Sequence, residues 1–267
     1  RIVSIVNIMQ TRNPFMTPDQ YLQNVIRIKS HIPLQVTDYR LNNITGLIKT
    51  WAGSYLREIK LSGSSAKNVV VSGEADTDLF ISLKSDTPQD LKTIFESLAT
   101  KLQQNGYPVS KRTVAIQTQS NGQKIDLVPG KVQSGFQNWH SLYNSDTGNW
   151  LQTNIDEHIN AVKNSGRLDE IRVLKIWCKC HALKFPSLYI ELIIFEALYN
   201  KNKGQLAINV WTILEYLRDK FVDKRIEDPS NSNNILSDYL LTKQQKEAIA
   251  RKAGECLKAQ FWENIVW

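Results

Sequence analysis

The pattern of apolar and polar residues divides the chain into a mixed first half and a helical second half. Over residues 36–56, apolar side chains recur at helical intervals, which predicts one long amphipathic helix. These apolar residues are Ile44, Leu47, Ile48, Trp51 and Tyr55. An earlier helix is expected to open at MTPDQYLQNVI, which begins at Met16. Residues 1–15 are therefore interpreted as a short helix or, preferably, as an extension upstream of a start at Met16.

Four apolar runs in the first half predict β-strands. They cover residues 57–62, 76–84, 112–118 and 123–129. The last two runs are joined by Ser120-Asn121-Gly122, and Asn-Gly is typical of a two-residue hairpin turn. A helix is expected over residues 88–104, opened by Pro88 and closed by Asn105-Gly106.

The second half has helical periodicity almost throughout. Helices are expected over residues 154–164, 167–183, 187–200, 205–221 and 243–261. Thr153 with Asp156 is expected to cap the first of them, and Thr242 with Gln245 has the spacing of a capping box for the last. The pattern predicts an α+β protein with a mixed core lobe over residues 16–150 and a helical lobe over residues 151–267.

Composition and charge add only broad limits. The 267 residues are 42% hydrophobic and 22% charged, which suffices for a core of normal size, and no apolar run is long enough to span a bilayer. The first fifteen residues lack the apolar region and cleavage site of a signal peptide. The net charge of +7 suits a polyanionic ligand, either a nucleoside triphosphate or a nucleic acid.

Three cysteines, Cys178, Cys180 and Cys256, do not make a disulfide framework, so we expect a reducing, cytoplasmic location. Cys178, Cys180 and His181 are close enough in sequence to suggest a zinc site. On a helix, however, Cys180 points away from the other two, and a fourth ligand is missing. Small core residues are the preferred interpretation.

Three aspartates are the candidate metal-binding residues. Asp76 and Asp78 stand one residue apart at the start of an apolar strand, so both carboxylates lie on one face. A cation would relieve their repulsion, and an all-oxygen environment suits Mg²⁺. Asp126 lies in a later strand; if the two strands are neighbours, three carboxylates converge. Such a site can hold two Mg²⁺ ions that clamp the attacking and leaving oxygens of a phosphoryl transfer.

A Gly-Ser pair precedes the acidic strand. Gly63 allows the backbone to come close to a phosphate, and the Ser64 hydroxyl with nearby N–H groups can donate to it. A second pair, Gly53-Ser54, lies inside the predicted helix and too far upstream. The spacing of Gly63-Ser64, the acidic pair and the later strand aspartate is therefore the signal for nucleotide chemistry.

Two other interpretations of the acidic residues stay open at this point. Glu74 and Asp76 could form the acidic pair, although the apolar strand begins directly after Asp78. The aspartates could also mark a solvated strand end or an isolated calcium-type site.

These motifs resemble a known family. GSSAKNVVVSGEADTDLFISL together with KIDLVPG is similar to the polymerase β-type nucleotidyltransferase core. More narrowly, the chain from about Met16 onward resembles the bacterial cGAS/DncV-like nucleotidyltransferases of anti-phage CBASS systems. Three further stretches carry this resemblance: WLQTNIDEHINAV, RVLKIWCKCHALKFPSLYIELII and EDPSNSNNI. The implied fold is a mixed β-sheet with helices, a helical C-terminal lobe and a long N-terminal helix bridging the two.

The resemblance implies roles for individual residues. Asp76, Asp78 and Asp126 would be the catalytic metal ligands for two Mg²⁺ ions, for which Mn²⁺ can substitute, and Asp126 would help to activate the attacking hydroxyl. Gly63 and Ser64 would contact the triphosphate of the donor nucleotide. In the helical lobe, three residues would bind the nucleotide: Lys175 and Ser187 at its triphosphate, and Tyr189 at its base.

Without the family match, a solvated helix lysine is the preferred explanation of Lys175, and a plain helix cap explains Ser187 equally well. Related chains often carry an aromatic residue directly after that serine, where this chain has Leu188. Either Tyr189 takes over the stacking on the base, or an aliphatic contact suffices.

The implied activity is template-independent synthesis of a cyclic di- or oligonucleotide second messenger from NTPs, with release of pyrophosphate, in anti-phage signalling. An effector protein would read the product, and neither a membrane nor a bound nucleic acid would be required. The alternatives are an RNA-terminal nucleotidyltransferase of the CCA-adding or oligoadenylate type and a non-catalytic nucleotide or nucleic-acid sensor with the same fold. Antibiotic-modifying nucleotidyltransferases share the fold, but the helical-lobe motifs fit them less well.

Overall fold

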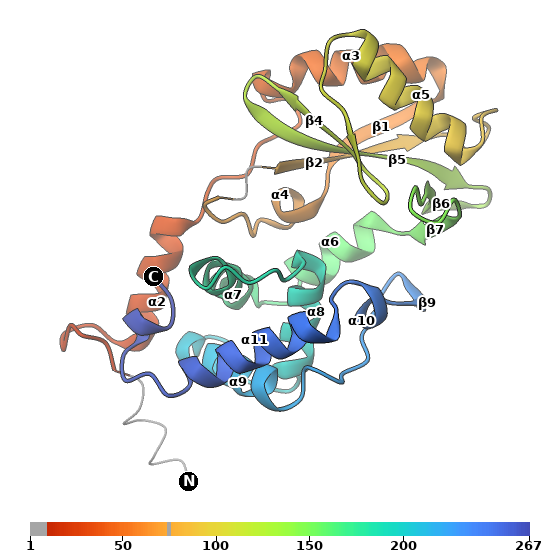
Figure 1. Cartoon of the computed structure of the whole chain (residues 1–267). Coiled ribbons are helices and arrows are strands. Elements are labelled where there is room, and N and C mark those ends of the chain that lie inside the picture. The colour runs from red at the N-terminus through yellow and green to blue at the C-terminus, as the bar shows by residue number, and fades with distance from the viewer. Residues whose placement is uncertain (1–9, 74–75) are drawn as a thin grey trace. The chain divides into compact units, whose positions relative to one another are not determined.

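The computed structural model of the protein describes residues 10–73 and 76–267, which divide into two compact units (Figure 1). The strand unit comprises Ile32–Asn68 and Gly73–Ala161. The helical unit comprises the described residues up to His31, Val69–Ser72 and Val162–Trp267. The expected boundary at residue 150 is wrong in two respects: the strand unit extends to Ala161, and the N-terminal helix belongs with the helical unit.

One sheet organises the strand unit. Within the described residues it has seven strands in the order β1-β2-β5-β4-β3, and β6 pairs with both β5 and β7. The strands are β1 (Leu56–Leu61), β2 (Asp76–Leu83), β3 (Ser110–Lys111), β4 (Ile116–Ser120), β5 (Gln123–Gln133), β6 (Phe136–Tyr143) and β7 (Trp150–Thr153). The pair β2 and β5 is parallel and the other pairs are antiparallel. The four predicted strands are confirmed, whereas β3, β6 and β7 were not predicted.

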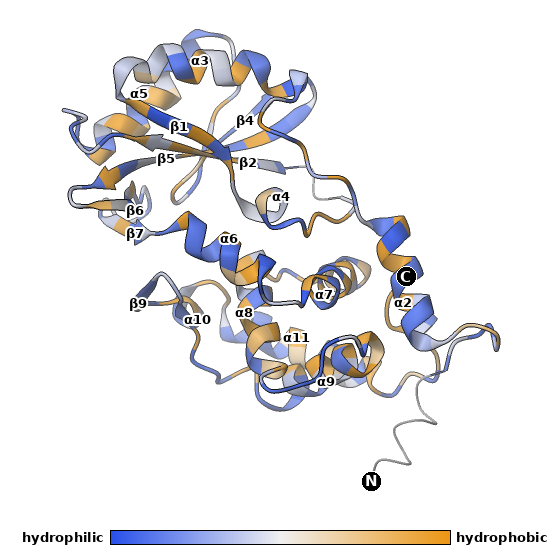
Figure 2. Ribbon diagram, turned by 180° about the vertical axis from the view of Figure 1, so that it is seen from behind, coloured by the Kyte–Doolittle hydropathy of each residue, from blue (hydrophilic) through white to orange (hydrophobic). Residues whose placement is uncertain are grey.

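Two helices cover one face of this sheet: α3 (Asn42–Ala52) and α5 (Leu91–Gln104). Alternate residues of β2 face them and are buried with apolar residues of both helices, because side chains along a strand alternate between faces. In Figure 2, both helices carry apolar and polar positions, as expected for helices with one face on a sheet. The buried residues of β2 in this core are Leu79, Ile81 and Leu83.

The single long helix predicted over residues 36–56 was wrong in extent. The structure has a short 3₁₀ turn at Tyr39–Leu41, then α3, and a second 3₁₀ turn at Gly53–Tyr55. Gly53 at the C-cap has φ +54° and ψ −134°, a backbone conformation that favours glycine and ends α3. The apolar spacing of α3 continues into this turn, so periodicity alone overestimates the length of the helix.

Local signals determined other boundaries. Asp90, rather than Pro88, caps α5 by accepting from the Thr93 N–H. Helix α6 (Ile155–Lys163) is capped by Asn154, whose Oδ1 accepts from the Glu157 N–H, so the predicted cap at Thr153 was one residue early. The Asn121-Gly122 turn of the β4–β5 hairpin is confirmed, with φ +48° and +74°.

The helical unit is built from α2 (Pro18–Lys29), α7 (Leu168–Cys180), α8 (Ser187–Ala197), α9 (Leu206–Asp219), α10 (Leu236–Tyr239) and α11 (Lys243–Cys256). A small sheet joins β8 (Glu227–Asp228) to β9 (Asn231–Ile235). The core includes the fully buried side chains of Trp177, Tyr189, Phe221 and Trp262. The capping box of Thr242 and Gln245 at α11 is confirmed.

The expected N-terminal helix bridging the two lobes is not formed by the described residues. Helix α2 ends at Lys29 within the helical unit, and α3 belongs to the strand unit. Pro33 follows α2 closely and disfavours a helical backbone at the preceding residue. Two separate helices therefore replace the bridging one. In the described part of the chain, no helix has both the length and the apolar character needed to cross a membrane.

A buried ion pair ties α7 to the loop between α8 and α9. The Arg167 guanidinium donates to Glu170 Oε1 at 3.1 Å, and both side chains are only 6% exposed. Asn209 of α9 donates to the same carboxylate oxygen at 2.8 Å. The guanidinium also donates to three backbone carbonyls, those of Leu198, Lys201 and Asn202. Arg167 thus satisfies polar groups that water cannot reach.

Replacing Arg167 with methionine is expected to lower the free energy of unfolding by about 3–5 kcal/mol, because the Glu170 charge and the carbonyls stay buried without their donor. Urea denaturation measures the change. Arg218→Met is the matched control, since Arg218 pairs with Asp219 at the surface, and should cost less than about 1 kcal/mol. Equal losses in the two variants would contradict the structural role of the buried pair.

Candidate active site

The two acidic residues of β2 lie on the face opposite its apolar core residues. Asp76 is exposed and Asp78 is half-buried, whereas Thr77 and Leu79 between and after them are buried. Asp78 is held where the chain turns: the Ser62 N–H donates to the Asp78 carbonyl at 2.9 Å. The predicted sharing of one strand face by Asp76 and Asp78 agrees with this burial pattern.

Asp126 lies on the strand next to β2. In the parallel register, Asp126 of β5 is directly beside Asp78, and Lys124 is beside Asp76. Residues paired across neighbouring strands share a face of the sheet, and the strands are about 4.8 Å apart. The sheet therefore brings the Asp78 and Asp126 side chains to the same face as neighbours, as the sequence predicted on condition that these strands adjoin.

The surroundings of Asp126 disfavour its charged form. Burial is the main cause that raises the pKa of Asp126, and the nearby Asp76 carboxylate raises it further. A hydrogen bond from the Gln117 side chain and the positive charge of Arg112 act in the opposite direction. The Asp126 Oδ1 atom is buried and has no hydrogen-bond partner within the described residues. This carboxylate is therefore placed where a positive charge would stabilise it.

Gly63 lies directly against the acidic strand. It is the first residue of the short helix α4 (Gly63–Lys67) and has φ +55°. A Cβ atom at this position would overlap Asp78 Oδ2 and lie 2.6 Å from Asp78 Cγ. Ser64 follows within the same turn. The Gly-Ser pair and the aspartate are thus neighbours in space, and only glycine fits this approach.

The three carboxylates fit a divalent metal by their chemistry. Carboxylate oxygens are the ligands that Mg²⁺ prefers, and the unpartnered Oδ1 of Asp126 is a donor for such an ion. In residues 10–73 and 76–267, no group of three or more His, Cys, Asp or Glu has the spacing of a preformed metal cage. Glu74, the alternative acidic partner of Asp76, lies outside the described residues. The donor set therefore supports a metal, although the carboxylates are not already gathered around one point.

The remaining predicted site residues lie in the helical unit. Lys175 of α7 is 2% exposed, and its ammonium group donates to the Val69 carbonyl at 3.1 Å. The simple alternative of a solvated helix lysine was therefore wrong. Ser187 is the first residue of α8 and is half-buried. The cap position belongs to Pro186, and no side chain caps this helix, so the alternative of Ser187 as a helix cap was wrong as well.

The stacking role expected for Tyr189 is not supported. Its side chain is fully buried, with its ring 5.6 Å from that of Phe185 and 5.5 Å from that of Phe221. Burial also raises the pKa of Tyr189 to about 12. The ring belongs to the core of the helical unit, so a base cannot stack on it unless these aromatic residues move apart. Leu188 is partly buried against the same core.

The cysteines have structural surroundings. Cys178 and Cys256 are buried thiols, and no cysteine of the described chain forms a disulfide. Trp177 Nε1 donates to Cys256 Sγ at 3.3 Å, and His181 Nε2 lies 2.8 Å from the Ile265 carbonyl. The zinc alternative at Cys178, Cys180 and His181 therefore gains no support from the described residues, in agreement with the preferred interpretation as core residues.

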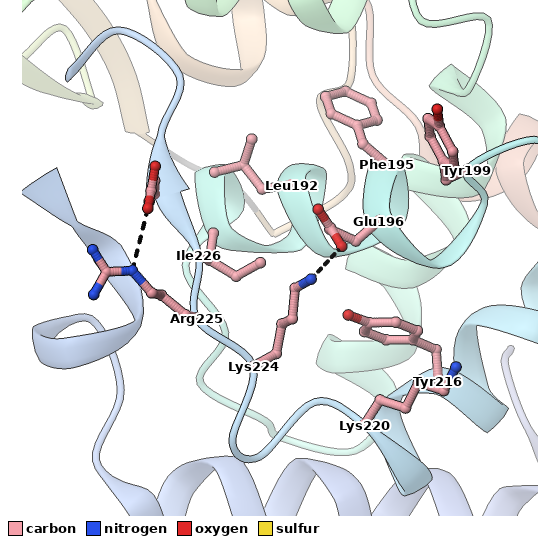
Figure 3. A pocket seen from close by; sticks show the side chains of 10 residues that line it. Leu192, Phe195, Glu196, Tyr199, Tyr216, Lys220, Lys224, Arg225 and Ile226 are labelled. Carbon is pink, nitrogen blue, oxygen red and sulfur yellow. Dashed lines mark hydrogen bonds and ion pairs between the residues drawn. The ribbon is translucent and has the colours of Figure 1, made fainter. Parts of the chain in front are cut away.

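A large groove in the helical unit contains none of the predicted site residues. It has a volume of about 800 Å³ and is lined by aromatic and charged side chains (Figure 3). Four of its charged groups form two ion pairs, Lys224 with Glu196 at 2.6 Å and Arg225 with Glu227 at 3.2 Å, and Lys220 also lines it. The size of this groove alone does not make it the active site, because most of its charged groups already pair with each other.

Two residues beside Asp126 were missed by the sequence analysis. Gln117 of β4 is directly opposite Asp126 in the β4–β5 register. The Nη2 atom of Arg112 donates to Gln117 Oε1 at 2.8 Å. Counting outward from the two-residue turn at Asn121-Gly122 pairs Gln117 with Asp126, so the signal was present in the hairpin.

Known proteins resemble this chain in sequence and in fold. No family model matches the chain. A cyclic AMP-AMP-AMP synthase of Escherichia coli (strain MS 115-1) is 28% identical over an alignment of 265 residues. The match covers 83% of this chain and 82% of that protein. The solved structure of E. coli MS115-1 CdnC with ATP superposes with a TM-score of 0.68 at 21% identity, covering 88% of this chain and 89% of that one.

A second solved structure, Bradyrhizobium diazoefficiens CdnG in complex with GTP, has a TM-score of 0.69 at 12% identity and covers 90% of each chain. Elizabethkingia meningoseptica CdnE, a cyclic dinucleotide synthase solved with GTP and Apcpp, has a TM-score of 0.68 at 15% identity, covering 90% of this chain and 98% of that one. These likenesses show the nucleotidyltransferase fold. Together with the sequence relative, they indicate that the chain is an enzyme, a nucleotidyltransferase, which is similar to the cGAS/DncV-like synthases.

Proposed function

We propose that this enzyme joins nucleoside triphosphates into a cyclic di- or oligonucleotide and releases pyrophosphate, with Asp76, Asp78 and Asp126 as its catalytic metal ligands. The observation that carries the proposal is the register of β2 and β5, which makes Asp78 and Asp126 neighbours on one sheet face, with Gly63 packed against Asp78. The sequence relative, a cyclic AMP-AMP-AMP synthase, supports ATP as one of the substrates.

Mg²⁺ held by these carboxylates, or Mn²⁺ in its place, would polarise the phosphate that is attacked and stabilise the charge on the leaving pyrophosphate. The chain's own residues hold and orient the reactants. Asp126, a carboxylate whose pKa is raised, is proposed to take the proton of the attacking 2′- or 3′-hydroxyl. Gly63 lets the backbone of α4 approach the site closely.

We further propose that Ser64, Lys175 and Ser187 contact the triphosphate of the donor nucleotide. A lysine is suited to this as a flexible point charge. Because the Lys175 ammonium is bonded to the Val69 carbonyl, it would share or exchange that bond when a phosphate binds. The product is proposed to act as a second messenger, read by an effector protein in anti-phage signalling in the cytoplasm.

The test is to incubate the purified protein with all four labelled NTPs and Mg²⁺ or Mn²⁺, and to resolve phosphatase-resistant products. We expect resistant products that disappear with EDTA and return with either metal. Omitting one NTP at a time identifies the bases, and nuclease digestion identifies the linkages. Extension of added RNA would favour the RNA-terminal transferase instead, and nucleotide binding without any product would favour the sensor.

A further inference from the structure

A row of three polar side chains crosses the sheet at the proposed site. Asp78 of β2, Asp126 of β5 and Gln117 of β4 are paired directly with one another in consecutive strands, so all three point to the same face. Ile116 and Thr118, on either side of Gln117, point to the other face and are buried. Gln117 is therefore the residue of β4 placed to contact Asp126.

The Gln117 side chain is a hydrogen-bond partner of the Asp126 carboxylate. The oxygen of its amide is held by Arg112, whose Nη2 donates to Gln117 Oε1 at 2.8 Å. A guanidinium can only donate hydrogen bonds and an ionised carboxylate can only accept them. The Gln117 amide therefore has one consistent orientation, with its oxygen toward Arg112 and its NH₂ group toward Asp126.

Arg112 is itself anchored through its backbone. Its N–H donates to the Ala115 carbonyl at 2.8 Å, and its carbonyl accepts from the Ser145 hydroxyl at 2.8 Å. The backbone position of Arg112 is thus held from two sides, which restricts where its guanidinium can lie. Asp126 Oδ1 meanwhile has no partner within the described residues and stays available to a metal ion or a hydroxyl.

We propose that Gln117 is a positioning residue that orients the Asp126 carboxylate, and that Arg112 acts through Gln117 by fixing the orientation of its amide. The proposal rests on the proposed role of Asp126 in nucleotide transfer. Groups that hydrogen-bond to a metal-binding carboxylate hold it in one orientation, and losing them costs about 10- to 100-fold in metal affinity or activity.

Three variants test the proposal: Gln117→Leu, Arg112→Met and the double variant. Leucine is close to glutamine in size but makes no hydrogen bond. We expect Gln117→Leu to lower kcat by about 10- to 100-fold, with KM for the NTPs changed by less than about threefold, because the proposed contact is with a catalytic carboxylate and not with the substrate. The double variant should lose less than the two single losses combined, because the hydrogen bond of Arg112 acts through Gln117, although its charge also reaches Asp126 directly.

The matched control is Gln119→Leu. Gln119 lies on the same strand and face but is exposed and opposite Lys124, so kcat should stay at the wild-type value. Thermal unfolding of all variants checks that the sheet is intact.

A second readout does not depend on turnover. Mn²⁺ binding to the metal-free protein is measured by electron paramagnetic resonance, where Gln117→Leu should weaken binding by about tenfold and Gln119→Leu should not. Wild-type Mn²⁺ binding and kcat in Gln117→Leu would overturn the proposal, and so would additive losses in the double variant. If the wild-type protein makes no product at all, the proposed activity fails, while the Mn²⁺ measurement still decides the positioning role.

Discussion

Replacing Asp126 with asparagine is expected to lower the rate of nucleotide transfer by about 10³-fold or more, which corresponds to about 4 kcal/mol in the barrier. An amide oxygen is a weaker ligand for a hard cation than a carboxylate, and an amide cannot take a proton from the attacking hydroxyl. The measurement is kcat at saturating NTP and Mg²⁺. Asp86→Asn is the control, since Asp86 is an exposed aspartate outside the site, and should keep the wild-type rate.

The same substitution should stabilise the metal-free fold at neutral pH. Burial and the Asp76 charge raise the pKa of Asp126 in the folded protein. The stability that its protonated form contributes is present below the ordinary aspartate pKa of about 4 and is lost as pH rises through the raised value. Asparagine cannot ionise, so Asp126→Asn avoids this loss.

Urea denaturation in EDTA, at about pH 4 and at about pH 8, measures this effect. The variant should gain stability over the wild-type protein at the higher pH, whereas Asp86→Asn should not. A variant that loses both activity and stability at the higher pH would indicate damage to the sheet instead of loss of a catalytic carboxylate.

Substituting alanine for Gly63 is expected to lower the transfer rate by about 100-fold or more. The new Cβ would overlap Asp78 Oδ2, so the carboxylate or the turn has to shift. A displacement of about 1 Å in a catalytic group can cost about 100-fold in rate. Steady-state kinetics with saturating NTP measure the effect as a fall in kcat.

Gly53→Ala separates this clash from backbone strain. Gly53 belongs to the same unit and has φ +54°, close to the +55° of Gly63, but a Cβ there meets nothing within 4 Å. Both variants should lose about 1 kcal/mol of stability or more, because an L-residue is strained at positive φ. Only Gly63→Ala should lose activity. If both variants lose activity equally, strain in the turns and not the approach to Asp78 controls the rate.

Local chemistry in the sequence predicted much of the strand unit. The alternation in DTDLFISL, the Asn-Gly turn and the later KIDLVP strand were enough to place three carboxylates on strands. Their convergence depended on β2 and β5 being neighbours, which is a non-local pairing that periodicity does not contain. Strands β6 and β7 were missed, although Ser134-Gly135 forms the turn between β5 and β6, with φ +83° at Gly135.

The wrong or missed predictions concern residues whose role depends on burial or on a partner from a distant part of the chain. Tyr189 follows the predicted triphosphate serine by two residues, yet Phe185 and Phe221 enclose it in the helical core. The apolar spacing of residues 36–56 continued across Gly53, whose positive φ ends the helix. Gln117 looked like any polar strand residue until its register opposite Asp126 was known.

By itself, the sequence determined the type of most long elements, the α+β class and the acidic strand, because turns, caps and side-chain alternation act within a few residues. Its motifs also showed the resemblance to a nucleotidyltransferase. Tertiary structure alone decided which strands adjoin, that α2 belongs with the helical unit, and which polar side chains meet at Asp126. The physical reason is that burial and hydrogen bonding there depend on groups brought together from distant parts of the chain. Gly63 illustrates the difference between the two. Its place before the acidic strand was visible in the sequence, but its contact with Asp78 exists only in the fold.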